Sequence, residues 1–397
     1  MKRALVTSLD LHLRFQAEEI VETECLKDVG AGIYPCYYIR DGDRLKVSTS
    51  ASSLVIDSGD LVPDPEFAPP DFLRWHFRQH ELTFRLERKF RHVFGLPKIK
   101  EMDPWYESSR SVDARVSKLS AFESVTATST ASAFRPDFSI RNREVIVEQS
   151  VRHVLAFIEA IEGEFPDHHN VIMTGGKDSQ LILLAPKRNP DRWHFFSAEP
   201  NYSLNVKWMA KNGVRVNRTF FHDNRNEESG EDLRRKIVCG DLYSDPTHIR
   251  WMPTVRKIAR EFDERCLFWG GTMSSPAHFY AGGHRADFTR DREAFFRSHF
   301  GRTAAFQGNY HQVFKNFTGL PYLSPYHSSA IWDELYQHID PAIYTNDEDL
   351  RIQIGEKLFG KPVWWPEANP GPDDYAYPRY LNARKTYLEH IRSSLKQ

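Results

Sequence analysis

Residues 171–184, VIMTGGKDSQLILL, place a polar turn with two glycines between an apolar triplet and a run of leucines. The triplet 171–173 is typical of a short buried strand, and residues 179–185 are typical of a helix that Pro186 ends. A strand that runs through a tight turn directly into a helix is characteristic of a parallel sheet with crossover helices. This stretch therefore sets the fold that we expect for the region around it.

The same alternation of strand and helix continues towards the C-terminus. Further strand candidates are the apolar runs WHFFS at 193–197, VRVNRTFF at 214–221 and CLFWGG at 266–271. Helix candidates lie between them at 203–212, where Gly213 provides a C-terminal stop, and at 253–262. We therefore predict an α/β fold in which a parallel sheet has flanking helices.

The length of 397 residues exceeds the usual size of one compact domain, so two domains are expected. Residues 1–115 form the first, which is strand-rich, because IYPCYYIR and RLKVSTS flank the turn DGD and predict a hairpin. Residues 116–144, rich in Ser, Thr and Ala, are interpreted as a connector. The second domain, 145–397, begins with an amphipathic helix over 144–165 and is expected to be mixed and mostly helical towards its end.

The charge balance does not favour a nucleic-acid or membrane partner, since 53 Lys and Arg residues stand against 54 Asp and Glu residues. The cysteines show neither a CxxC pair nor metal-ligand spacing and are interpreted as reduced thiols: Cys25, Cys36, Cys239 and Cys266. The N-terminus lacks the apolar core of a signal peptide, and no stretch approaches the roughly 20 apolar residues that cross a bilayer. We therefore expect a cytoplasmic location.

The turn after the first strand carries groups that suit a phosphate. Ligands of such sheets bind beyond the carboxyl ends of the strands, where a helix N-terminus presents unpaired amides. The turn adds flexible glycines, two hydroxyls and a positive charge, which come from Gly175, Gly176, Thr174, Ser179 and Lys177. Asp178 would repel phosphates unless a cation lies between them, which predicts Mg²⁺ as a cofactor with Asp178 as its ligand. The alternative is an ordinary β-turn that leads into a helix.

The turn TGGKDS resembles the PP-loop, Ser-Gly-Gly-x-Asp-Ser, of the ATP pyrophosphatases, with Thr174 in place of the first serine. In that family the loop holds the pyrophosphate that leaves when a substrate oxygen is adenylated. The resemblance implies ATP as a cofactor and an adenine-nucleotide α-hydrolase-like fold. The order of segments over about 145–370 is similar to the synthetase domain of asparagine synthetase and its relatives, the β-lactam synthetases and lasso-peptide cyclases. For FFSAEPN at 195–201, this similarity implies that Ser197 binds the nucleotide.

Two further segments resemble the same family, one of them with a departure. GLPYLSPYHSSAIWDEL matches a family region through Pro325 and Tyr326. The family's second glycine loop, Gly-x-Gly-x-Asp-Glu, corresponds to GGTMSS, which implies nucleotide binding by Gly270 and Gly271 but lacks both acidic residues. Metal binding is therefore expected to be weaker, rearranged or supplied by other carboxylates, for which Asp245 and Glu199 are the candidates.

The N-terminal region departs from the family in its chemistry. The glutamine-hydrolysing domain of the family needs a cysteine directly after the initiator methionine, whereas Lys2 stands here. Residues 1–115 are therefore interpreted as a reduced relic of that domain without glutaminase activity. We predict an ATP-dependent amide-forming ligase that releases AMP and pyrophosphate. Its expected partners are a carboxylate and an amine, carried by small-molecule or peptide substrates.

Developing charge on the phosphates calls for cations placed in advance. Lys177 is the first candidate. The stretch DLRIQIGEKLFGKPVWW adds Arg351, Lys357 and Lys361, and the relatives carry an essential lysine near this point. The resemblance therefore implies a catalytic role for Lys357 or Lys361. The alternative is a solvated helix face with Lys and Glu at intervals.

Two other functions stay open. A PP-loop ligase that modifies tRNA would use the stretch 73–100, which interleaves basic and aromatic residues, although amphipathic helices with arginines on the wet face give the same pattern. A nucleotide-binding protein without catalysis would account for the missing acidic pair of the second glycine loop.

Overall fold

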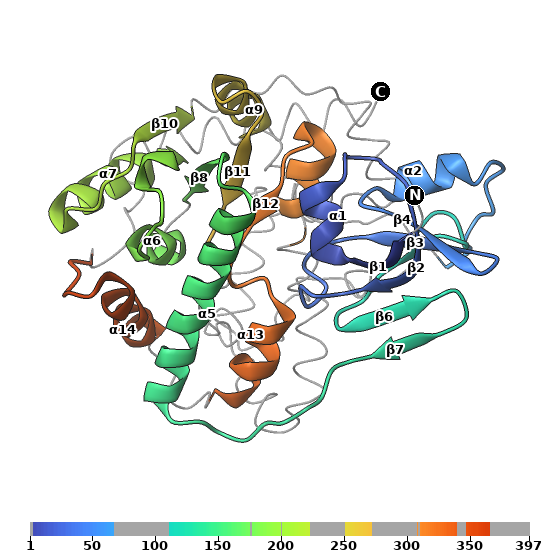
Figure 1. Cartoon of the computed structure of the whole chain (residues 1–397), viewed down its shortest axis with the longest axis horizontal. Helices are drawn as coiled ribbons and strands as arrows, with labels where there is room; N and C mark the ends of the chain where they lie inside the picture. Colours follow the sequence, from blue (N-terminus) through green and yellow to red (C-terminus); the bar gives the residue numbers. More distant parts are fainter. Residues whose placement is uncertain are drawn as a thin grey trace, which may run out of the picture.

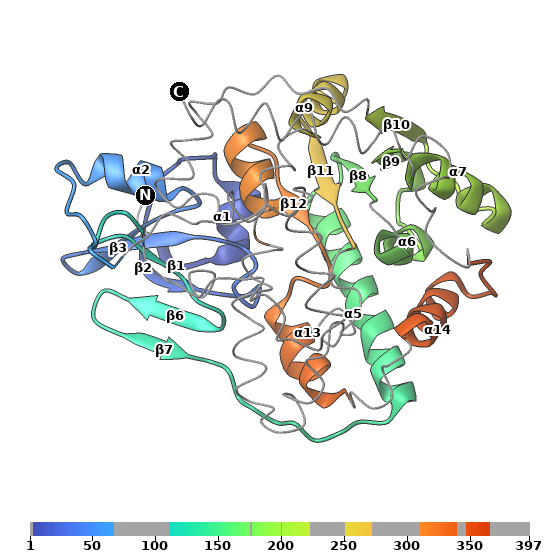
Figure 2. The same cartoon turned by 180° about the vertical axis from the view of Figure 1, so that it is seen from behind.

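The structure is a computed structural model that describes residues 3–66, 111–174, 177–199, 201–222, 251–271, 308, 310–339 and 347–365. The described residues form two sheets, which lie side by side with helices packed around them (Figures 1 and 2). The first sheet is mostly antiparallel and belongs to the N-terminal part of the chain, and the second is parallel. The chain therefore has a mixed α/β fold.

The first sheet has the strand order β5-β3-β4-β2-β6-β7, with β1 paired in parallel to β2. Its strands are β1 (Arg3–Thr7), β2 (Val21–Lys27), β3 (Tyr37–Asp41), β4 (Arg44–Ser48), β5 (Ser117–Lys118), β6 (Glu123–Thr126) and β7 (Thr130–Ser132). The predicted hairpin is confirmed, because β3 and β4 pair in antiparallel across Gly42, whose φ is +63°. Two short helices accompany the sheet, α1 (Ser8–Arg14) and α2 (Ala51–Asp57).

The interpretation of residues 116–144 as a connector was wrong for the stretch 117–132. This stretch supplies β5, β6 and β7 to the first sheet. Its apolar residues Leu119, Phe122 and Val125 are buried, while the Ser and Thr residues around them are mostly exposed or half-buried. The strands are two to four residues long, so their pairing with β2 and β3 determines their conformation, and composition alone does not reveal it.

The second sheet has the order β10-β9-β8-β11-β12, and every neighbouring pair is parallel. Its strands are β8 (His169–Met173), β9 (Trp193–Ala198), β10 (Arg218–His222), β11 (Cys266–Trp269) and β12 (Tyr322–Leu323). The helices around it are α5 (Arg143–Glu164), α6 (Lys177–Leu184), α7 (Asn201–Asn212), α9 (Met252–Glu261), α13 (Ser329–Glu334) and α14 (Asp347–Phe359). The predicted strands and helices of this region are therefore confirmed, with bounds that differ by a few residues.

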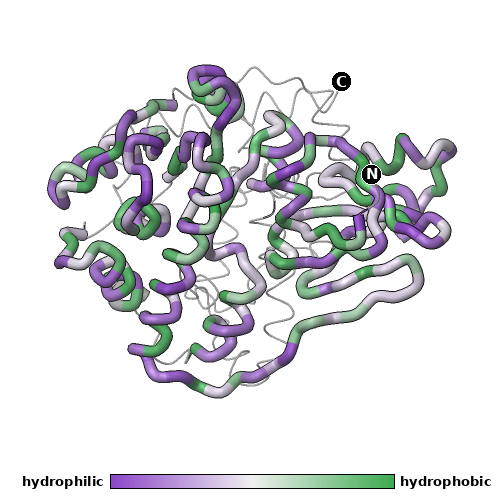
Figure 3. The backbone as a smooth tube through the Cα atoms, in the orientation of Figure 1, coloured by the Kyte–Doolittle hydropathy of each residue, from purple (hydrophilic) through white to green (hydrophobic). Residues whose placement is uncertain are grey.

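Both faces of the second sheet are buried, because alternate residues of each strand point to opposite faces. Ile172, Phe195 and Leu267 belong to one apolar cluster with α5, α6, α7 and α14. Val171 and Phe196 belong to a second cluster with α9 and the helical segment 310–318. Figure 3 shows apolar and polar residues alternating along α5, as expected for a helix with one buried side.

The strand order reverses between β8 and β11. The helices that follow β8 and β9 lie on one face of the sheet, and those that precede β11 and β12 lie on the other. In such sheets a ligand crevice forms beyond the carboxyl ends of the strands where the order reverses. A ligand crevice is therefore expected between the turn after β8 and the loop after β11.

The first sheet is anchored to the second part of the chain by polar contacts as well as by packing. Lys315 Nζ donates to the backbone carbonyl of His12 at 2.9 Å, and Gln312 Nε2 donates to the hydroxyl of Tyr37 at 2.6 Å. Within the described ranges, no helix has the length and apolar character needed to span a bilayer.

Candidate functional site

The turn after β8 is attached to the neighbouring strand and helix by a buried polar network. Ser197 Oγ donates to the backbone carbonyl of Thr174 at 2.7 Å, and Asn205 Nδ2 donates to Thr174 Oγ1 at 2.9 Å. Gln180 Nε2 in turn donates to Asn205 Oδ1 at 2.9 Å. All four side chains are fully buried. The network therefore fixes the start of the turn against β9 and α7, and it brings the predicted site residues Thr174 and Ser197 together.

Ser179 links the turn to the loop after β11. Its hydroxyl donates to the backbone carbonyl of Met173 at 3.2 Å and accepts the backbone N–H of Gly271 at 3.1 Å. The side chain is buried. The predicted site residues Ser179 and Gly271 are thus in direct contact, although the hydroxyl that was expected to face a phosphate bonds to backbone groups.

The two glycines after β11 allow an unusually close approach of the chain. A Cβ atom on Gly271 would lie 2.3 Å from the backbone C and O of Asp178 and the N of Ser179. A Cβ atom on Gly270 would lie 1.6 Å from the hydroxyl of Tyr322. A side chain on Gly271 would collide with backbone atoms, so this glycine lets the first turn of α6 pack directly on the end of β11, whereas Gly270 makes room for the buried side chain of Tyr322.

An ion pair stands at the first turn of α6. Arg351 Nη2 of α14 lies 3.1 Å from Asp178 Oδ1, with the side chains 12% and 21% exposed. Tyr326, in the loop after β12, is 1% exposed and lies within electrostatic range of both charges. Burial, together with the Asp178 carboxylate, raises the pKa of Tyr326, so its hydroxyl remains a neutral donor. Three elements therefore meet at the carboxyl end of β8.

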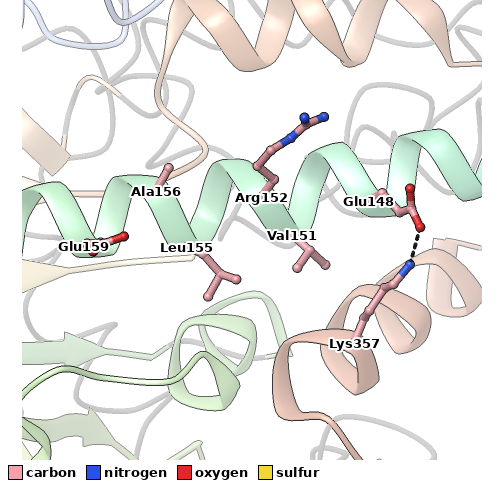
Figure 4. Close-up of a pocket in the computed structure, with 7 residues that line it drawn as sticks. All are labelled: Glu148, Val151, Arg152, Leu155, Ala156, Glu159 and Lys357. Atoms are coloured by element: carbon pink, nitrogen blue, oxygen red, sulfur yellow. Dashed lines mark hydrogen bonds and ion pairs between the residues drawn. The ribbon is translucent and has the colours of Figure 1, made fainter.

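The lysines that were candidates for catalysis lie differently. Lys357 Nζ pairs with Glu148 Oε1 of α5 at 2.8 Å, and the Lys357 side chain is 49% exposed (Figure 4). Lys361 is exposed beyond the end of α14, where its Nζ lies 4.4 Å from the ring centroid of Phe359. Neither of these contacts involves a group at the turn after β8, whereas Arg351 of the same segment contacts Asp178 there.

Lys357 also borders a groove of about 410 Å³ along α5, whose lining residues are drawn in Figure 4. Its other lining residues all belong to α5, and they are Glu148, Val151, Arg152, Leu155, Ala156 and Glu159. No residue of the turn after β8 lines this groove.

Several predicted residues lie outside the described residues or are described only in part. Gly175, Gly176 and Asp245 are not among the described residues. Lys177 is the first residue of α6, and its side chain is not described. Glu199 is described and accepts the Ser203 hydroxyl at 2.6 Å, a contact that joins the end of β9 to α7.

The described carboxylates do not form a site for a divalent cation held by the protein alone. Within the described ranges, no group of three or more His, Cys, Asp or Glu side chains converges as metal ligands. At the turn itself, the carboxylate of Asp178 forms an ion pair with the cation of Arg351. A metal site would instead bring further oxygen ligands close to this carboxylate. The donor set therefore suits an anion better than a metal.

Sequence reasoning overlooked the polar network and undervalued Arg351. Asn205 precedes Trp208 and Met209 on the buried face of α7, and Gln180 precedes the leucines of α6; a polar residue at helical spacing from such apolar residues is the signal that could have identified them. Arg351 stood among the cations of its segment, but its contact with Asp178 joins residues 173 positions apart, which no local pattern reveals.

No protein-family model matches the chain, and no curated protein is similar enough to it to count as a relative.

Proposed function

We propose that the chain is an ATP-dependent ligase, similar to asparagine synthetase in its synthetase domain, that forms AMP and pyrophosphate. It adenylates a substrate carboxylate and joins the acyl group to an amine, without a glutaminase activity of its own. The observation that supports this most strongly is the position of TGGKDS, at the carboxyl end of the central strand β8 and beside the reversal of strand order. The finer fold assignment, adenine-nucleotide α-hydrolase-like, and the cytoplasmic location belong to the same proposal.

The proposed reaction has two steps. In the first, a carboxylate oxygen of the substrate forms a bond to the α-phosphorus of ATP, and the bond from that phosphorus to the bridging oxygen breaks, so that pyrophosphate leaves. In the second, the amine attacks the acyl carbon, AMP leaves and the amine loses a proton to solvent or a nearby base. Both steps need groups that stabilise negative charge on phosphate oxygens.

The described residues supply such groups. The first backbone N–H groups of a helix have no acceptor within the helix, and α6 begins at Lys177, directly after the turn that follows β8. Arg351 adds a positive charge next to them. The polar network around Thr174 and Ser197 keeps the start of the turn in place, which reduces the reorganisation needed when charge develops.

A nucleotide-binding protein without catalysis is the second candidate. It is favoured by the segment GGTMSS at 270–275, which lacks both acidic residues of the family's second glycine loop. The tRNA-modifying alternative relies on the stretch 73–100, which lies outside the described residues.

Pyrophosphate release from ATP tests the proposal. The purified protein is assayed against a panel of carboxylates paired with amines, with and without RNA, and the products are identified by phosphorus NMR. Release of AMP and pyrophosphate that requires both a carboxylate and an amine supports the ligase. Release that requires RNA supports the tRNA alternative, and nucleotide binding without any release supports the second candidate.

A pair of variants connects any turnover to the site. Asp178→Ala removes the carboxylate that holds Arg351 and is expected to lower turnover at least tenfold. Asp167→Ala is the matched control, because Asp167 is exposed and lies just before the amino end of β8. Equal turnover in the two variants would contradict the assignment of the site.

A further inference from the structure

The charges around the carboxyl end of β8 have the arrangement of an anion site. The first turn of α6 contributes backbone N–H groups and the positive end of a helix dipole. Arg351 contributes a guanidinium that is only 12% exposed, so its charge is weakly screened by solvent. These groups come from α6 and α14, which pack against each other (Figures 1 and 2).

Tyr326 provides a second and independent indication of a ligand. Its hydroxyl is buried and has no hydrogen-bond partner among the residues that the structure describes. A buried donor without a partner costs on the order of 1–3 kcal/mol, and such a group in a native protein calls for an explanation. Because it lies within electrostatic range of Asp178 and Arg351, an oxygen-rich ligand at that place would give it an acceptor.

One oxygen of the Asp178 carboxylate, the group that was predicted to bind Mg²⁺, is in contact with a guanidinium. In a PP-loop site with Mg²⁺, the aspartate would neutralise the metal and the metal would neutralise the phosphates. Here the carboxylate contacts Arg351 Nη2 at 3.1 Å. A guanidinium carries five N–H donors in a planar fork, so it can bond to a carboxylate and to a phosphate at the same time.

We propose that Arg351 is a phosphate-binding residue and the resident cation of this site, so that the chain binds the pyrophosphate part of its nucleotide without a divalent metal. This inference depends on the proposed function, because it names the charge partner of the same leaving group. Asp178 acts as a positioning residue that directs the guanidinium towards the first turn of α6. Tyr326 donates its hydroxyl to the bound oxygen atoms.

Isothermal titration of inorganic pyrophosphate into the full chain, with EDTA present throughout, tests the inference. The wild type is expected to bind saturably. Arg351→Gln is expected to weaken binding on the order of 10- to 100-fold, the value of one charge-assisted hydrogen bond. Arg188→Gln is the matched control, since Arg188 forms an exposed ion pair with Glu159 at 2.9 Å, and it should leave the affinity unchanged.

The change in pyrophosphate affinity caused by Asp178→Asn distinguishes the two possible roles of the carboxylate, positioning residue or metal ligand. Asparagine keeps a side-chain oxygen for Arg351 but removes a negative charge near the phosphates, so metal-free binding should become tighter, by about tenfold. A metal-ligand role instead predicts no binding in EDTA and a loss of Mg²⁺-dependent binding in this variant. Arg351→Lys, which keeps the charge but not the fork, should lie between wild type and Arg351→Gln, and it replaces that variant if Arg351→Gln does not fold.

The outcomes separate this inference from the proposed function. If the wild type binds pyrophosphate only with Mg²⁺, or if Asp178→Asn weakens binding in EDTA by tenfold or more, the inference is wrong while the ligase proposal survives. If pyrophosphate and ATP bind under neither condition, both are wrong. Binding in EDTA that depends on Arg351 and not on Arg188 supports the inference even where no acyl substrate has been found.

Discussion

Replacing Gly271 by alanine would insert a methyl group into the contact between β11 and α6. The new Cβ atom would lie 2.3 Å from the backbone C and O of Asp178 and from the N of Ser179. Because these are backbone atoms at the start of a helix, they cannot rotate away as a flexible side chain would. The helix must shift, and the hydrogen bond from Gly271 N to Ser179 Oγ at 3.1 Å is lost or stretched.

The expected cost follows from these two effects. Forcing an extra methyl group into a packed region costs about 1–3 kcal/mol. Loss of the buried hydrogen bond adds about 1 kcal/mol. Gly271→Ala should therefore lower the free energy of unfolding by about 2–4 kcal/mol, measured by urea denaturation with circular dichroism at several protein concentrations. It should also weaken pyrophosphate binding, because the first turn of α6 is displaced.

Gly163→Ala is the control for the same substitution. Gly163 lies in α5, and a Cβ atom there would meet only Arg188 Nη1 at 3.6 Å, which is an ordinary contact. Since alanine favours a helix over glycine, this variant should gain up to about 1 kcal/mol. The reasoning would be refuted if Gly271→Ala were as stable as the wild type, or if the two alanine variants changed stability by the same amount.

Three further predictions concern other parts of the molecule. Burial lowers the pKa of His12 to about 3, whereas the unfolded state binds a proton at this residue near pH 6.5. The free energy of unfolding is therefore not reduced by His12 above about pH 6.5, and it decreases as the pH falls from there towards 3. His12→Gln should therefore flatten the decline of the unfolding free energy between pH 6 and 4 by about 1.4 kcal/mol per pH unit, as measured by urea titrations, and an unchanged slope would exclude this role of His12. Asn205→Leu leaves Thr174 Oγ1 and Gln180 Nε2 without their buried partner and should cost about 2–4 kcal/mol in chemical denaturation; a loss below about 0.5 kcal/mol would show that the network is not intact in solution. Lys357→Gln breaks only an exposed ion pair and should leave the thermal midpoint and pyrophosphate affinity unchanged, so a large loss of affinity would place Lys357 at the site after all.

The parallel sheet was predictable because its signals are local. β8, the turn and α6 follow one another directly within residues 169–184, and the alternation of apolar runs with helical patterns repeats the signal three times. Strands that are buried on both faces read as continuous apolar runs, which few loops imitate. The bounds of α6, α7 and α9 accordingly differ from the predictions by one or two residues.

The first sheet and the charge arrangement were not predictable in the same way. β5 and β7 are two and three residues long, and only their neighbours in space show that 117–132 is strand and not connector. The requirement for glycine at position 271 comes from a backbone that is 92 residues away in sequence at Ser179. Arg351 contacts Asp178 of α6, whereas Lys357 contacts Glu148 of α5. Which of the two cations lies next to α6 depends on the side of α14 that faces it, and their positions in the sequence do not determine that side.

Calorimetric titration with α,β-methylene-ATP, which resists cleavage at the bond that the proposed reaction breaks, tests the central claim without any knowledge of the acyl substrate. If the end of β8 and the first turn of α6 hold the phosphates, the analogue should bind saturably, and an excess of pyrophosphate should displace it. Absence of binding, or binding that pyrophosphate leaves undisturbed, would contradict the assignment of this edge of the sheet as a nucleotide site.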